Sequence, residues 1–329
     1  MKFPLIHTGM RFFFFTFATE GRRRVLSRLE RGVARPALLP AGVAVSAVWR
    51  GLHAAEPAFT ASDWVAMPDH VHLLLIVRGA VAFNPLVFAR WFMEATEDAA
   101  AGLEWHVPTA SARWMAPSPR GDGEGDGPPR LWAREAYVEI SFDGRQLRAI
   151  RRYIRLNPAR WWWKHDHPDR FVLIRPLRHP RLPASGAWSG MGDATLLSSP
   201  FLYPVRLSQG APPGTPGGEA AIAAAVDRAR RGWVPLCGFL SEAEREFGRR
   251  LRDLPHARWI KTVPYGLPAR CDPGVEDSRW LAAGRELLLA APGMEAFPPW
   301  QATRPGCLAM NAANAELCAG LEGRGAGRA

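Results

Sequence analysis

Two histidines separated by a single apolar residue, His70 and His72, open a run of aliphatic side chains. In a β-strand successive side chains point to opposite faces, so both imidazoles share one face while Val71 points into the core. Two imidazoles side by side on a rigid strand can supply two ligands to one divalent cation. The alternative is a histidine pair that only occupies the surface of a strand.

A second group of polar side chains follows later in the chain. Tyr153 and Asn157 are four residues apart, so on a helix they lie one turn from each other on the same face. The phenol oxygen of Tyr153 could attack a phosphodiester, and the amide of Asn157 offers a carbonyl oxygen to the same metal. Arg151, Arg152 and Arg155 surround the pair with positive charge suited to a phosphate backbone.

Together the two stretches resemble the single-tyrosine HUH transposases, in particular the REP-associated tyrosine transposases. In that family a strand reads Met-Pro-Asp/Asn-His-Val-His-Leu-Leu and a later helix reads Tyr-Ile-x-x-Asn-Pro. Residues 67–74 and 153–158 match both runs in the same order. The resemblance implies that His70, His72 and Asn157 hold Mg²⁺ or Mn²⁺ and that Tyr153 attacks DNA. It also implies an α+β HUH nuclease domain, in which helices flank an antiparallel sheet.

The activity that this resemblance implies is cleavage and rejoining of single-stranded DNA at hairpin-type repeats. Attack by Tyr153 would leave a 5′-phosphotyrosine and a free 3′-hydroxyl. A phenol with a pKa of about 10 is a poor nucleophile, so a metal or nearby arginines must favour the phenolate. Of the four tyrosines in the chain, Tyr137, Tyr203 and Tyr265 lack an asparagine one helical turn away.

Two other functions remain open at the level of sequence. The first half could be an inactive DNA-binding module that recognises repeat hairpins with the same residues. Alternatively, the second half could bind a nucleotide while the first half serves as its DNA-targeting arm. The expected partner in each case is DNA, and both a homodimer and a monomer are compatible with the residues.

Periodicity predicts the elements that position these side chains. The aromatic run at 11–18 predicts a central strand, and 62–66 and 71–77 predict an antiparallel hairpin. Asn84-Pro85 predicts the start of a helix that ends near Glu97. The remaining predictions are an extended segment at 131–142 and a catalytic helix at 143–156, which Pro158 ends or kinks.

The first domain is predicted to span residues 1–180. A proline- and glycine-rich segment at 107–130 interrupts it as a flexible insertion. Beyond Pro158, Arg160, Trp161, Trp162 and Lys164 are candidate DNA-binding residues. Tryptophans between basic residues could stack unpaired bases, or could equally cap the core of the domain.

A proline-studded linker at 181–200 is predicted to lead into a second domain at 201–322. Alternating strand and helix patterns there predict an α/β Rossmann-like domain with a parallel sheet. The run from Arg304 to Asn311 is distantly similar to DNA-processing protein A. No glycine-rich phosphate-binding loop follows the first strand of this half, which favours a structural or DNA-guiding module over a nucleotide-binding enzyme.

The overall composition agrees with a polyanionic partner. The formal charge is +11, and residues 1–190 carry +9 of it, almost entirely as arginine. The four cysteines show no Cys-x-x-Cys spacing, which argues against a zinc ribbon and suits a reducing compartment. No apolar run approaches the length of a membrane span and no signal peptide is evident, so we expect a cytoplasmic protein without a membrane partner.

Overall fold

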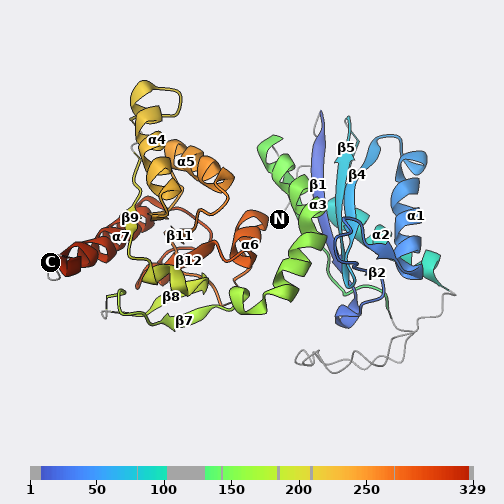
Figure 1. Cartoon of the computed structure of the whole chain (residues 1–329). Coiled ribbons are helices and arrows are strands. Elements are labelled where there is room, and N and C mark those ends of the chain that lie inside the picture. Colours follow the sequence, from blue (N-terminus) through green and yellow to red (C-terminus); the bar gives the residue numbers. More distant parts are fainter. Residues whose placement is uncertain are drawn as a thin grey trace. The chain divides into compact units, whose positions relative to one another are not determined.

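The computed structural model describes residues 9–79, 81–101, 130–141, 144–183, 186–207, 210–269 and 271–325, with backbone only for 145 and 319–325. The predicted insertion at 107–130 lies outside these ranges except for Arg130. The chain divides into two compact units, Met1–Trp162 and Trp163–Ala329. Figure 1 shows the elements of both units, and each unit is described separately below.

The first unit is built on a four-stranded antiparallel sheet, so the chain has a mixed α and β architecture. The predicted hairpin of the histidine-bearing strand is confirmed, because this strand pairs antiparallel with the strand before it. The aromatic first strand is central, as predicted, and its other neighbour is the last strand. The order across the sheet is β4 (Phe59–Ala66), β5 (His70–Val77), β1 (Arg11–Ala18) and β6 (Tyr137–Ser141).

Helices cover both faces of this sheet (Figure 1). One face packs against two helices through a large apolar core that includes Phe15, Leu73 and Phe92. The other face packs against a single helix through a smaller cluster that includes Leu74 and Ile154. The two helices are α1 (Pro40–Ala55) and α2 (Pro85–Ala100), and the single helix is α3 (Gly144–Asp166).

The remaining features of the described part of the first unit are a helix cap, an isolated β-bridge and three short elements. Asn84 caps α2 through its side chain, as the Asn-Pro pair predicts. Thr19 forms an isolated bridge with Trp132, which ties the segment before β6 to the end of β1. The short elements are η1 (Glu20–Arg22), β2 (Ser27–Arg28) and β3 (Ala37–Leu38).

The predicted end of helix α3 at residue 156 is wrong, because the helix continues through Pro158 to Asp166. Proline lacks the N–H that would bond to the carbonyl of Ile154, so one backbone hydrogen bond is lost. The helix persists because Ile154, before the proline, and Trp161, after it, pack on the same cluster under the sheet. Tertiary packing therefore outweighs the local preference of proline.

The second unit contains a six-stranded mixed sheet. The four strands on one side run parallel, as the alternating pattern predicts, while the two on the other side run antiparallel. Residues 181–200, predicted as a linker, instead contribute one of these strands and bury Trp188, Met191 and Leu197. The order is β7 (Ile174–Leu177), β8 (Trp188–Gly192), β12 (Glu286–Ala290), β11 (Trp259–Thr262), β10 (Val234–Cys237) and β9 (Leu202–Pro204).

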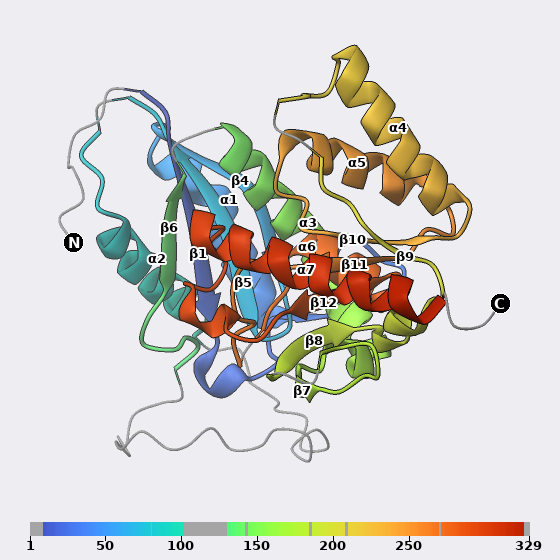
Figure 2. The same cartoon turned by 90° about the vertical axis from the view of Figure 1, so that its left-hand side faces the viewer.

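Helices of the second unit divide between two core clusters. Helices α4 and α5 share one cluster through Ile222 and Phe247, and α7 joins the other through Met310. Figure 2 shows α7 in red, crossing β11 and β12 apart from α4 and α5. The predicted capping box of Ser241 and Glu244 is confirmed at the start of α5. The bounds are η3 (Pro168–Phe171), η4 (Ala194–Ser198), α4 (Pro216–Arg230), α5 (Glu242–Asp253), α6 (Val275–Ala282), η5 (Met294–Ala296) and α7 (Arg304–Gly325).

None of the helices in the described part of the chain combines the length and the apolar character needed to cross a bilayer.

Candidate functional site

The histidine pair lies on the face of β5 that α3 covers. Val71 and Leu73 point to the opposite face, into the core with α1 and α2, as strand alternation predicts. The ring centroids of His70 and His72 are 4.8 Å apart with the rings nearly perpendicular. The strand therefore holds two imidazoles next to each other beneath α3.

Both imidazoles are held by their Nδ1 atoms. The Nδ1 of His70 lies 2.7 Å from Oδ1 of Asp69, and the Nδ1 of His72 lies 2.8 Å from the hydroxyl of Thr16 on β1. The Nε2 of His72 is buried and has no hydrogen-bond partner. A partner on Nδ1 fixes the orientation of a ring and leaves Nε2 as the atom that can bind a ligand.

The charge state of this pair follows from burial and from its neighbours. Burial lowers the pKa of His72 well below its usual 6.5, and His70, Arg160 and Arg22 lower it further, with only Asp69 opposing them. Burial alone would raise the pKa of Asp69, but its hydrogen bond and charge interaction with His70 and the nearby Arg22 lower it overall. His72 is therefore neutral at neutral pH.

Tyr153 lies directly against His72. Their ring centroids are 5.0 Å apart, and Phe14 of β1 contacts the tyrosine ring edge-on at 6.0 Å. The guanidinium carbon of Arg160, a buried residue, lies 5.6 Å from the centroid of the same ring. The packing of α3 on the sheet thus brings the ring of the predicted nucleophile next to one of the predicted metal-binding histidines.

Asn157 is 5% exposed, one helical turn beyond Tyr153, and its side-chain nitrogen has no hydrogen-bond partner. Such an orphaned amide suits a ligand, because rotation of the amide by half a turn exchanges its nitrogen and oxygen. Two imidazole nitrogens and one amide oxygen form a mixed donor set that fits Mn²⁺ and, less well, the oxygen-preferring Mg²⁺. Within the described ranges no three histidine, cysteine or acidic side chains gather as a metal cluster.

Two of the arginines that were predicted to surround Tyr153 lie elsewhere. Arg151 and Arg155 both form ion pairs with Asp63 of β4. The reason is helical geometry: residues two positions before and after Tyr153 project about 160° around the helix from it. Arg152 is exposed. Arg160, further along the same helix, is the arginine beside Tyr153.

The remaining candidates divide between packing and surface. Trp161 packs on the cluster between α3 and the sheet, as the core alternative predicts. Trp162 is half-buried and stacks with the guanidinium of Arg31 at 4.8 Å. Lys164 belongs to the second unit, where it pairs with Asp272.

Sequence reasoning missed the role of Thr16 in this site. It is the one polar residue within the otherwise aromatic run of β1, and it faces His72 in the register of the sheet. A polar residue at that position in a central strand was a signal that could have been read. Asp63, in contrast, carries no local signal, because its orientation depends on an irregularity in β4.

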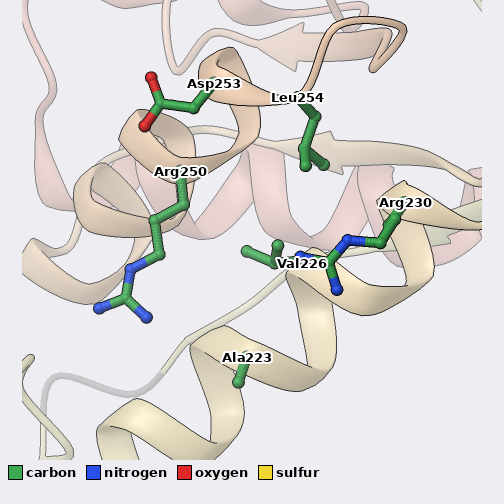
Figure 3. A pocket seen from close by; sticks show the side chains of 6 residues that line it. All are labelled: Ala223, Val226, Arg230, Arg250, Asp253 and Leu254. Atoms are coloured by element: carbon green, nitrogen blue, oxygen red, sulfur yellow. The ribbon is translucent and has the colours of Figure 1, made fainter.

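The second unit has a pocket of about 340 Å³ between α4 and α5 (Figure 3). Its charged lining residues are Arg230, Arg250 and Asp253. Arg250 is hydrogen-bonded to Glu246 and to Glu219 at 2.7 Å each. Arg230 pairs with Asp227 at 3.7 Å. Because carboxylates already pair with both arginines, the pocket does not have the unpaired positive charge that a phosphate would need.

No protein-family model and no curated protein matches the chain. Part of it is similar to a solved REP-associated tyrosine transposase bound to a REP hairpin, with 14% identity and a TM-score of 0.33, covering 50% of this chain and 74% of that one. DNA processing protein A from Helicobacter pylori, solved for its single-stranded DNA binding mode, gives 19% identity and a TM-score of 0.33, covering 45% and 67%.

A putative transposase from Deinococcus radiodurans gives 16% identity and a TM-score of 0.27, covering 47% of this chain and 95% of that one. Such low scores establish neither a family nor an activity, so the function has to rest on the residues of this chain.

Proposed function

We propose that this chain is a metal-dependent DNA strand transferase that cleaves and rejoins single-stranded DNA at hairpin-type repeats. The observation that carries the proposal is the contact between the Tyr153 ring and the His72 ring, at 5.0 Å. It joins two stretches that are far apart in sequence and that each predict one half of the same chemistry. Neither stretch alone would carry the proposal.

In the proposed reaction the phenol oxygen of Tyr153 attacks a backbone phosphorus of the bound strand. The bond from this oxygen to phosphorus forms while the bond from phosphorus to the 3′-oxygen breaks. The leaving 3′-oxygen takes up a proton, and the phenol proton goes to solvent. The phosphodiester energy is kept in a 5′-phosphotyrosine, so a 3′-hydroxyl from another strand can reverse the step and join the DNA.

Residues of the site would support this step in three ways. Arg160 holds a buried positive charge beside the Tyr153 ring, where a phosphate group of the bound strand would be attracted. Thr16 and Asp69 fix the two imidazoles by their Nδ1 atoms. His70, His72 and Asn157 would hold Mn²⁺ or Mg²⁺, which supplies positive charge to the scissile phosphate and to the transition state.

The proposal is tested by incubating the purified chain with 3′-end-labelled hairpin-bearing single-stranded DNA and Mn²⁺, then separating denatured protein by electrophoresis. We expect wild type to form a covalent protein–DNA adduct and Tyr153→Phe to form none. Tyr137→Phe is the matched control, because Tyr137 faces Thr16 in the sheet register and is 58% exposed. We expect this variant to form the adduct as wild type does.

An adduct that forms equally well with Tyr153→Phe would overturn the assignment of the nucleophile. Formation of the adduct after complete chelation of divalent cations would overturn the metal dependence. Hairpin binding that survives chelation, with no adduct on any strand, would support an inactive DNA-binding module instead.

A further inference from the structure

Asp63 is turned toward α3 by a β-bulge in β4. The register of β4 against β5 shifts between Ala61 and Trp64, which leaves Ser62 and Asp63 as the irregular residues. Ala61 and Trp64 both pack on the core with α1 and α2, whereas Val65 packs on the cluster under α3. In a regular strand Asp63 would share the face of Ala61; the extra residue turns it to the opposite face.

At that position Asp63 binds two arginines one helical turn apart. The Nε of Arg155 donates to Oδ1 at 2.7 Å, and the Nε of Arg151 lies 3.0 Å from Oδ2, without the alignment of a hydrogen bond. Arg151 also donates through Nη2 to the Ser62 hydroxyl at 3.2 Å, and this hydroxyl lies 3.2 Å from Oδ2 of Asp63. The Asp63 side chain is only 13% exposed.

The two arginines and the reactive residues occupy different flanks of α3. Arg151 and Arg155 project about 160° around the helix from Tyr153. Between these flanks lie Ile150 and Ile154, which pack on the sheet. Apolar packing holds the helix against the sheet but allows it to roll, since such contacts are not directional. The ion pairs with Asp63 are directional and fix one flank.

We propose that Asp63 is a positioning residue, which sets the rotation of α3 and thereby presents Tyr153 and Asn157 to His70 and His72. This inference rests on the proposed function and assigns Arg151 and Arg155 to an internal clamp instead of a DNA contact. Asp63 forms no hydrogen bond or ion pair with His70, His72 or Tyr153, so it acts through the helix.

The test compares Asp63→Asn with wild type in single-turnover adduct formation at saturating hairpin DNA, alongside the dissociation constant for the same DNA. We expect the rate to fall about tenfold, because the nucleophile is misplaced, while the dissociation constant stays unchanged. Asp63→Glu, which keeps the charge, should recover part of the rate. Glu20→Gln is the matched control, because the Glu20 side chain is half exposed and its ion pair, with Arg23 at 3.9 Å, involves no residue of α3.

A double-mutant cycle sharpens the result. If Asp63 acts through its arginines, Arg155→Gln also lowers the rate of adduct formation. Asp63→Asn then lowers the rate by a smaller factor in the Arg155→Gln background than in wild type. Arg155 is 69% exposed, so this variant also serves if Asp63→Asn fails to fold.

Wild-type rates in folded Asp63→Asn would overturn the inference and leave the proposed function intact. Tighter DNA binding by Asp63→Asn at an unchanged rate would also overturn it, since the arginines would then be phosphate ligands that Asp63 holds back. Absence of any adduct with wild type would overturn the proposed function and this inference with it.

Discussion

His72 in the first unit and Glu286 in the second are both almost fully buried, at 4% and 1% exposed, and each has a polar atom without a hydrogen-bond partner. Burial is the largest cause of the pKa shift in both. It lowers the pKa of His72 well below its usual 6.5 and raises the pKa of Glu286 to about 8. Both shifts favour the neutral form of the side chain.

The two residues differ in what surrounds them. His72 contacts a second imidazole and a tyrosine on a helix, which are groups that bind cations or attack phosphorus. Glu286 lies near Lys261, whose ammonium is already bonded to both carboxylate oxygens of Asp277 at 2.8 Å. A buried orphan atom therefore marks a candidate site only where reactive groups converge on it.

The largest effect is expected at His72. His72→Ala removes the ring that contacts Tyr153 and one proposed metal ligand, and we expect adduct formation to fall about a thousandfold. The loss of stability should be smaller than for Leu73→Ala, since His72→Ala also removes a buried nitrogen that has no hydrogen-bond partner. Single-turnover rates and urea unfolding measure the two effects, and near-wild-type cleavage would remove His72 from the site.

Leu73→Ala is the counterpart on the opposite face of the same strand. Leu73 is fully buried against α1 and α2, so the free energy of unfolding should fall by about 3 kcal/mol. The adduct rate per folded molecule should stay close to wild type. A stable Leu73→Ala protein that has lost cleavage would show that the two faces are not functionally separate.

Glu286→Gln tests the other member of the comparison. The folded chain keeps this proton up to about pH 8, whereas the unfolded chain releases it near 4.5, so stability falls as pH rises through this window. The variant should lack this loss and should exceed wild type by about 3 kcal/mol at pH 7, with cleavage unchanged. Parallel stability curves between pH 5 and pH 8.5 would contradict the assignment.

The smallest effect is expected at Thr16. Thr16→Val keeps the shape of the side chain but removes the hydroxyl that holds Nδ1 of His72. Loss of such an orienting partner weakens a metal site by about tenfold, so Mn²⁺ affinity and adduct rate should fall together. A variant that loses neither would mean that the strand alone orients the ring.

The features that the sequence could predict follow from the periodicity of side chains within single strands and helices. Alternation along β5 separates His70 and His72 from the core, and the four-residue spacing places Tyr153 and Asn157 on one helical face. Each pattern involves residues of a single strand or helix, so it can be recognised in one short stretch of sequence. The contact between Tyr153 and His72 could be expected only from the resemblance, because it joins two elements.

The features that could not be predicted depend on tertiary context. The bulge that turns Asp63 toward α3 leaves no mark in the local sequence. Pro158 stays within α3 because the packing of Ile154 and Trp161 outweighs its local preference. Residues 181–200 read as a linker because their prolines and glycines hide a short buried strand.

The most direct test of the account is to find the atom that carries DNA after cleavage. Hairpin DNA labelled at either end would be incubated with the chain and Mn²⁺, and the adduct digested and analysed by mass spectrometry. We predict that the 3′-end label remains with the protein, the 5′-end label is released, and the modified peptide carries DNA on Tyr153. DNA on Tyr137, or retention of the 5′-end label, would contradict the account.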